Sequence, residues 1–386
     1  MTVPLLDLKP QLQALRGELQ EAIMEVVDST GYIMGPKVEA LEKAVAGYLG
    51  TEHAIGVSSG TDALLLALMG LEVGEGDWVV TAPFSFFATA GVVARLGARP
   101  VFVDIDADSF NLDPAKLQEY LEGLPAQEIA KVKAIIPVHL YGQCAHMDAI
   151  NKVAGKYGIA VIEDAAQAIG AEYPGASGRR RAGTLGTMGC FSFFPSKNLG
   201  AMGDAGLIST NDGALADQLR IKRVHGGSPK YYHKVIGGNF RIDPIQAAVL
   251  LVKLPHLESW HQQRRENAAY YTSLLAERGL AQVNPPQEMY GGAGLTNPHI
   301  YNQYVIRVQR RDELRQHLSE RGVSTEIYYP VSFHEQECFS YLGYQSGDFP
   351  ESERAAAETV ALPIYPELTR SMQEYVIDML GEFYAG

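Results

Sequence analysis

Apolar positions along the first two thirds of the chain follow two alternating patterns. Short, nearly continuous apolar runs, typical of strands buried on both faces, alternate with amphipathic stretches that have helical spacing. Helical spacing covers residues 11–28, 38–49, 62 onward, 112–124 and 145–158, and apolar runs begin near 53, 78, 99, 133, 159, 190 and 206. Because strands that alternate with helices usually lie parallel in one sheet, the pattern predicts an α/β fold.

The alternation stops near Leu254, after which helical patterns dominate. We therefore predict that residues 1–254 form an N-terminal segment with a large domain, and that 255–386 form a smaller α+β domain. Within the smaller domain, 302–308 and 322–334 have strand character. A length of 386 residues fits two domains, since single cores seldom grow past about 250–300 residues.

Composition narrows the class of protein. A hydrophobic content of 46% and a charged content of 20% are typical of a soluble globular protein. The net charge of -13 argues against a nucleic-acid partner, which needs a basic face. The three cysteines have no paired or metal-type spacing, which indicates a reducing compartment and no metal site. With no signal-like start and no membrane-length apolar segment, we expect a cytoplasmic protein without a membrane partner.

Lys197 is the first candidate for chemistry. It follows the aromatic run 190–194 and precedes a loop of small residues that contains Gly200, Gly203 and Gly206. An amine in such surroundings is expected to be semi-buried, and burial lowers the pKa of a lysine and makes it nucleophilic toward carbonyls. This stretch alone is equally compatible with a solvated lysine after an edge strand.

A turn of small residues is the second candidate. Ser59, Gly60 and Thr61 lie between an apolar strand and an apolar helix. Backbone N–H groups and hydroxyls at a helix start suit a phosphate. The turn lacks the Gly-Lys-Ser/Thr of a Walker loop and the chain lacks a Gly-x-Gly-x-x-Gly dinucleotide motif. Taken singly, helix capping by Ser59 or Thr61 explains it as well.

Asp164 ends the apolar strand 159–164, and Gln167 follows on the same side of the turn. Ligands of open α/β sheets bind at the carboxyl ends of the strands. A carboxylate placed there by a buried strand needs a cation or a protonated nitrogen. Asn239 and Arg241, which directly precede an apolar helix, suit an anion in the same way.

These features together indicate one cofactor, pyridoxal 5'-phosphate. Its aldehyde suits Lys197, its ring nitrogen suits Asp164, and its phosphate suits the turn at 59–61. Its flat ring suits an aromatic side chain near Phe86. Each feature is a weak signal alone, but their joint order along the chain is a strong one.

The chain also resembles the DegT/DnrJ/EryC1/StrS family of nucleotide-sugar aminotransferases, which are fold-type I pyridoxal-phosphate enzymes. The matching stretches are PLLDLKPQ, GYIMGP, SSGTDAL, TAPFSFFATA, VHLYGQ, VIEDAAQAIGA, FSFFPSKNLGAMGDAG, RVHGG, NFRIDPIQAA and YYP. The resemblance implies a mostly parallel, seven-stranded sheet between helices, and a homodimer with shared active sites.

The resemblance also implies roles for particular residues. Lys197 would bond covalently to the cofactor aldehyde, and Asp164 would pair with the ring nitrogen. The other cofactor contacts would come from Ser59, Gly60, Thr61, Phe86, Gln167, Ser192 and, in the second subunit, Asn239. The sugar nucleotide would face Arg241, Tyr329 and Tyr32.

The implied reaction moves an amino group from L-glutamate to a keto nucleotide-sugar, for cell-surface polysaccharide or deoxysugar biosynthesis. VHLYGQ favours amination at C3 of a UDP- or dTDP-linked hexose over C4, the perosamine type. LYGQCAHMDAI and KYGIAVIEDAAQ resemble the UDP-2-acetamido-2-deoxy-3-oxo-glucuronate aminotransferase group. Tyr328 stands where that group often has histidine, which leaves the sugar open.

Three other functions fit the sequence less well. A sugar dehydratase of this family would have histidine in place of Lys197. A nucleotide-sugar oxidoreductase would need the missing glycine motif. A non-catalytic pyridoxal-phosphate regulator would usually carry a DNA-binding segment, for which this chain has neither spare length nor basic charge.

Overall fold

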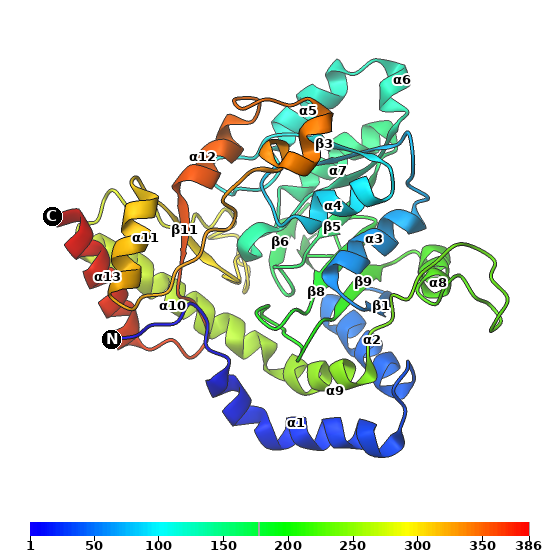
Figure 1. The fold of residues 1–386 in the computed structure, drawn as a ribbon, viewed down its shortest axis with the longest axis horizontal. Coiled ribbons are helices and arrows are strands. Elements are labelled where there is room, and N and C mark those ends of the chain that lie inside the picture. The colour runs from blue at the N-terminus through cyan, green and yellow to red at the C-terminus, as the bar shows by residue number, and fades with distance from the viewer. Residues whose placement is uncertain (177, 386) are drawn as a thin grey trace.

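The computed structural model describes residues 1–176 and 178–385, in which a large α/β body lies beside a smaller, mainly helical region (Figure 1). The centre of the body is a seven-stranded sheet in the order β1-β9-β8-β5-β4-β2-β3. Its strands are β1 His53–Val57, β2 Trp78–Thr81, β3 Arg99–Phe102, β4 Val132–Ile136, β5 Ala160–Asp164, β8 Met188–Ser192 and β9 Gly206–Thr210. Only β9 runs against the others within this sheet. The expected mostly parallel, seven-stranded α/β sheet is therefore confirmed.

The strand register brings the candidate residues to one edge. β5 pairs in parallel with β8, so Asp164 lies opposite Cys190 and close to Ser192. The central strands β5 and β8 are mostly buried and apolar, as a sheet covered on both faces requires, and Glu163 and Asp164 stand as buried acidic residues at the end of β5. Because parallel strands end on the same side, the segments after β5 and β8 meet there.

Nine α-helices of the described chain belong to the first 254 residues, and most agree with the predicted ranges. They are α1 Lys9–Ser29, α2 Pro36–Leu49, α3 Gly60–Gly70, α4 Ala88–Arg95, α5 Pro114–Gly123, α6 Ala126–Ile129, α7 Met147–Tyr157, α8 Gly213–Lys222 and α9 Pro244–Lys253. α3 is apolar all round because it is enclosed by the sheet, α4 and α8. The helix begins at Gly60, and Ser59 is its N-cap.

The smaller region combines four α-helices with a two-stranded sheet. It contains α10 Leu257–Glu277, β10 Tyr304–Arg307, α11 Arg311–Glu320, α12 Pro350–Glu358, β11 Thr359–Leu362 and α13 Arg370–Ala385. β10 and β11 pair in antiparallel fashion, which confirms the strand expected at 302–308. Val3 packs into the core formed by α10, α11 and α13. The domain division after residue 254 stays a prediction.

The strand expected at 322–334 is wrong. This segment makes only single bridges, from Val323 to Val3 and from Glu326 to Ala361, and then enters a 3-10 turn at Phe333–Glu335. Pro330 has no N–H to donate to a ladder. The residues from 326 to 331 instead line a cavity. A strand-like composition was therefore overridden by the tertiary role of the segment.

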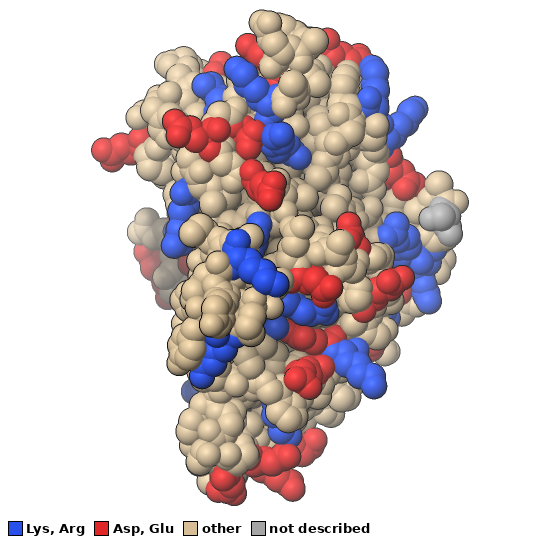
Figure 2. Space-filling model, turned by 90° about the vertical axis from the view of Figure 1, so that its right-hand side faces the viewer, with Lys and Arg blue, Asp and Glu red and all other residues tan. Residues whose placement is uncertain are grey.

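The hairpin of β6 Glu172–Gly175 and β7 Gly178–Arg181 is the second two-stranded sheet of the described chain. On the face that includes α8, basic and acidic side chains are interspersed rather than gathered in one patch (Figure 2).

Among residues 1–176 and 178–385, no helix has the length and apolar content needed to span a bilayer.

Candidate active site

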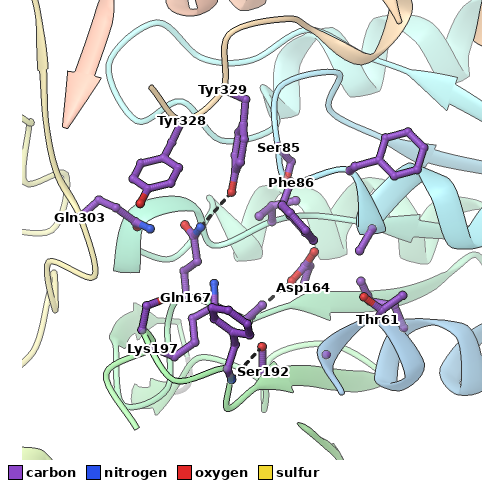
Figure 3. Close-up of a pocket in the computed structure, with 18 of the residues that line it drawn as sticks. Thr61, Ser85, Phe86, Asp164, Gln167, Ser192, Lys197, Gln303, Tyr328 and Tyr329 are labelled. Atoms are coloured by element: carbon purple, nitrogen blue, oxygen red, sulfur yellow. Dashed lines mark hydrogen bonds between the residues drawn. The ribbon is translucent and has the colours of Figure 1, made fainter. Parts of the chain in front are cut away.

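A cavity of about 670 Å³ opens at the carboxyl ends of β5 and β8. The start of α3, the loop before α4 and residues 326–331 of the smaller region enclose it. Figure 3 shows side chains from both regions pointing into this space. The expected site residues that line it are Ser59, Gly60, Thr61, Phe86, Asp164, Gln167, Ser192, Lys197 and Tyr329.

Lys197 enters the cavity from the loop that follows β8. Its N–H donates to the Phe194 carbonyl at 2.8 Å, which turns the chain back after the strand. The side chain is half-buried. Burial lowers the pKa of the amine to about 8, and the nearby Asp164 carboxylate opposes this shift. Near pH 7, more of this amine is therefore neutral than in an ordinary lysine, which makes it a competent nucleophile.

Asp164 is 5% exposed at the end of β5. Its carboxylate accepts hydrogen bonds from the Thr89 hydroxyl at 2.8 Å and from the Ala166 N–H at 3.2 Å. Burial raises the pKa of this carboxyl, although both hydrogen bonds act in the opposite direction. Neither donor is a cation, so a protonated ligand nitrogen in the cavity would be stabilised by the carboxylate.

The neighbouring Glu163 holds the end of β5 in place. It is fully buried and accepts from three backbone N–H groups of residues 183–186, at 2.6 to 2.7 Å. A fourth donor is His139 Nε2, at 2.8 Å. His139 Nδ1 accepts from the Ala145 N–H, which assigns the ring proton to Nε2. These contacts satisfy the carboxylate and fix the backbone on which Asp164 stands.

The start of α3 has the features of an anion site. The Ser59 hydroxyl accepts from the Asp62 N–H at 3.0 Å, while the first N–H groups of a helix have no partner within it. A Cβ on Gly60 would lie 2.7 Å from the Ser192 Cβ, so only glycine lets these segments meet. The cradle formed by Ser59, Gly60, Thr61 and Ser192 fits a phosphate.

Aromatic and amide side chains form the opposite wall. Gln167 accepts from the Tyr141 N–H at 2.7 Å. It also donates to the Tyr329 hydroxyl at 3.1 Å (Figure 3). The ring of Tyr329 lies 6.1 Å from that of Phe86 and 6.3 Å from that of Phe84, measured between centroids. An exposed Phe86 ring beside the cavity is available to cover a planar ligand.

Three expected site residues lie elsewhere. Asn239 is exposed and forms a single β-bridge with Val224, and Arg241 forms one with Val57. In the described chain the buried Nε of Arg241 has no hydrogen-bond partner. Tyr32 is half-exposed and donates to the Val27 carbonyl at 3.2 Å. None of the three is among the described residues that line the cavity.

Four residues that line the cavity or contact its lining were not predicted as site residues. Thr89 contacts Asp164 from 75 residues away, and Gln303, Glu326 and Tyr328 come from the smaller region. The only signal for Thr89 was its place in TAPFSFFATA, one turn after Phe86. The other three lie in segments whose contacts depend on how the two regions pack.

The residues present fit pyridoxal 5'-phosphate. Lys197 provides the amine, Asp164 a buried carboxylate without a cationic donor, and the glycine-lined cradle at 59–61 a phosphate site. Phe86 and Gln167 flank the space between them. The set matches the ring, aldehyde and phosphate of one molecule.

Comparison with known proteins agrees with this geometry. Residues 13–381 match the DegT/DnrJ/EryC1/StrS aminotransferase family. A "Pleiotropic regulatory protein" of Geobacillus stearothermophilus is 49% identical, with 100% of this chain and 99% of that protein covered. The dTDP-3-amino-3,4,6-trideoxy-alpha-D-glucose transaminase of Streptomyces venezuelae is 41% identical, covering 99% and 96%. The UDP-2-acetamido-2-deoxy-3-oxo-D-glucuronate aminotransferase of Pseudomonas aeruginosa is 40% identical, covering 95% and 96%.

Solved structures show the same fold along the chain. The crystal structure of DesV from S. venezuelae has a TM-score of 0.91 and 40% identity, covering 99% of this chain and 98% of that one. NtdA from Bacillus subtilis with the bound cofactor PMP has a TM-score of 0.83 and 30% identity, covering 95% and 81%. The family match extends over residues 13–381, and the fold agrees with that of solved relatives. The chain therefore belongs to the DegT/DnrJ/EryC1/StrS aminotransferase family, whose known structures are fold-type I.

Proposed function

We propose that this protein binds pyridoxal 5'-phosphate and transfers an amino group from L-glutamate to C3 of a UDP- or dTDP-linked 3-keto hexose. One observation carries the proposal: the Lys197 amine and the Asp164 carboxylate face one cavity, which the start of α3 closes with a phosphate-type cradle. A binding protein without chemistry has no need for an amine whose pKa is lowered to about 8.

The residues of this chain divide the chemistry between them. When bound, the cofactor accepts the electron pair left by the proton that leaves the amino donor. Asp164 keeps a proton on the ring nitrogen, since a buried carboxylate stabilises the cationic form. Lys197 Nζ would remove the proton from the α-carbon of glutamate in the first half-reaction and would deliver a proton to C3 of the sugar in the second. Gln167 and Tyr329, joined by a hydrogen bond, orient the ring and the sugar.

The choice of C3 rests on the names of relatives. The Streptomyces venezuelae transaminase and the Pseudomonas aeruginosa aminotransferase both carry a position-3 amino or oxo group in their names. One name has a dTDP sugar and the other a UDP sugar, at 41% and 40% identity, so the proposal includes both nucleotides. A UDP-linked 3-keto glucuronate derivative is therefore one of the substrates to be tested.

We also propose that a second copy of the chain completes each site. The described lining has one cation, Lys197, against the carboxylates of Asp164, Asp204 and Glu326. A phosphate-rich substrate needs more positive charge than this wall offers. Most residues of segment 225–241 are exposed, Asn239 among them, and the segment ends at Arg241, whose buried Nε has no hydrogen-bond partner in the described chain.

The same segment has the apolar surface that an interface needs. Tyr231, Tyr232 and Ile236 are 81%, 70% and 86% exposed in the single chain. Large apolar side chains that gather on one loop are typical of a surface covered by a partner. A twofold dimer would cover them and would place two copies of Asn239 and Arg241 at two cavities.

A second function, regulation through the bound cofactor, is suggested by the name of the relative that is 49% identical. Such a protein could keep Lys197 and Asp164 for binding alone. It would form the covalent link to the cofactor but would release no 2-oxoglutarate with any keto sugar.

The test is amino transfer by the purified, cofactor-loaded protein. It should be incubated with L-glutamate and UDP- or dTDP-linked 3-keto and 4-keto hexoses, with detection of 2-oxoglutarate and the amino sugar by mass spectrometry. We expect turnover with a 3-keto sugar and none in Lys197→Ala. Borohydride should fix the pyridoxyl group to Lys197. Mapping of that group to another lysine would refute the site, and cofactor binding without transfer to any sugar would favour the regulator.

A further inference from the structure

Lys253, near the end of α9, is a buried lysine that the chemistry above does not use. It is 6% exposed, and its one described hydrogen bond runs from Nζ to the Gly200 carbonyl at 2.7 Å. Burial lowers the pKa of this amine to about 8, and no charged neighbour in the described chain offsets the effect. A buried ammonium with one neutral acceptor costs stability that an apolar side chain would not. The contact with Gly200 is therefore the feature to explain.

Gly200 belongs to the loop that carries Lys197. The loop folds back on itself so tightly that a Cβ on Gly200 would clash with the Pro195 carbonyl oxygen. The next residue, Ala201, donates its N–H to the Phe193 carbonyl at 2.7 Å. The position of the Lys197 amine thus depends on where residues 200–202 are held.

A second side chain of α9 holds the same loop. Gln246 accepts from the Met202 N–H at 2.8 Å and donates to the Met202 carbonyl at 3.1 Å. Gln246 and Lys253 are seven residues apart, two turns of the helix, so they lie on one face. α9 itself packs along α1 and α2, as Figure 1 shows, which gives both side chains a firm support.

We infer that Lys253 and Gln246 are positioning residues for Lys197, which clamp the backbone of residues 200–202 and so hold the amine under the cavity. Their hydrogen bonds in the described chain go to Gly200 and Met202, which do not line the cavity, so both side chains act through the loop. The inference rests on the proposed function for the importance of Lys197, but the clamp itself is a property of the chain.

Lys222 on α8 provides a matched control. It is 7% exposed, it donates to the Met69 carbonyl, and burial lowers the pKa of its amine. Its chemistry is that of Lys253, whereas its acceptor lies at the end of α3 and not in the loop. Lys253→Met and Lys222→Met therefore remove the same kind of contact from two places.

The first measurement is amide hydrogen exchange of the cofactor-loaded protein. In Lys253→Met, the Ala201 and Met202 amides should exchange at least about tenfold faster, since a hydrogen bond to a charged group is lost. In Lys222→Met they should exchange as in the wild type. Exchange within twofold of the wild type in Lys253→Met, or equal acceleration in both variants, would overturn the inference. If Lys253→Met does not fold, Gln246→Ala breaks the clamp at a half-buried position and carries the same expectation for Met202.

The second measurement is the pH dependence of cofactor uptake by the apoprotein. The uptake rate should rise with pH to a midpoint near 8 in the wild type and in Lys222→Met, following the pKa of Lys197. A loosened loop admits water, so in Lys253→Met the midpoint should rise by about one unit toward the ordinary lysine value. An unmoved midpoint would contradict a positioning role. Covalent uptake of the cofactor by Lys197→Ala would refute the proposed function. The hydrogen-exchange rates of Ala201 and Met202 would still test the clamp.

Discussion

The two sides of the candidate site differ in how completely one chain builds them. At the ends of β5 and β8, Glu163 has four hydrogen-bond donors and Asp164 is buried on a fixed backbone. In segment 225–241, by contrast, apolar side chains are exposed and Arg241 has a buried Nε without a described partner. Exposed apolar side chains that gather in one segment support the proposal that a second chain covers this segment.

The comparison also separates two kinds of chemistry. The first side holds the reactive groups, an amine and a carboxylate whose pKa values burial has shifted. The second side holds neutral and cationic groups suited to an anion, Asn239 and Arg241. Substitutions on the first side should therefore stop the reaction, whereas substitutions on the second side should weaken binding of the cofactor and the substrate.

The largest effect is expected from Asp164→Asn. The change keeps the shape of the side chain and removes the charge, so turnover should fall by about 10² to 10⁴-fold while the cofactor still binds Lys197. Steady-state kinetics with glutamate and the preferred sugar measures the fall. Near-wild-type turnover would remove Asp164 from its proposed role.

The apoprotein of the same variant tests the cause. Because burial raises the folded-state pKa of Asp164 above its ordinary value, the folded apoprotein binds this proton more tightly than the unfolded chain. Ionisation of Asp164 therefore destabilises the fold as pH rises through that range, and the penalty is present at pH 7. Chemical denaturation at pH 7 should show Asp164→Asn apoprotein at least as stable as the wild type. A marked loss of stability would show that the carboxylate serves the fold.

Asn239→Ala is expected to have the next largest effect. Loss of a hydrogen bond to a charged phosphate costs about 1.5 to 3 kcal/mol, which corresponds to roughly ten- to a hundredfold weaker cofactor binding. Titration of the apoprotein with pyridoxal 5'-phosphate measures it, and turnover at saturating cofactor should change little. Unchanged affinity would mean that the phosphate is held without Asn239.

Ile236→Ser should have the smallest of these effects. If a partner covers this side chain, which is 86% exposed in the single chain, the lost apolar burial should weaken dimerisation about tenfold. Sedimentation over a range of protein concentrations measures the dissociation constant. Tyr341→Ser, at a 62% exposed site in the smaller region, is the matched control and should dimerise normally. Equal behaviour of the two variants would argue against an interface at this loop.

What the sequence could predict of the site was local. Asp164 at the end of an apolar strand, and Ser59 to Thr61 at the start of an apolar helix, follow from short-range patterns, and the structure places both at one cavity. The half-buried state of Lys197 followed from its aromatic and glycine neighbours. The sheet followed from the alternation of strands and helices, because parallel neighbours require crossover helices.

What the sequence could not predict depends on contacts between distant segments. Thr89 reaches Asp164 across 75 residues, and no periodicity marks it. Segment 322–334 has the composition of a strand, yet its residues line the cavity and pair only singly. The clamp of Lys253 on Gly200 joins residues 53 apart, and a lysine near a helix end usually faces solvent.

The central claim, that each site takes Lys197 from one chain and Asn239 from the other, is tested most directly by hybrid dimers. Lys197→Ala and Asn239→Ala chains should be mixed in equal amounts, unfolded, refolded together and assayed at limiting cofactor. Random pairing makes half of the dimers hybrids, each with one intact site, so about a quarter of wild-type activity should return. With hybrid formation confirmed by mass spectrometry, activity no greater than the sum of the two separately refolded variants would contradict the claim.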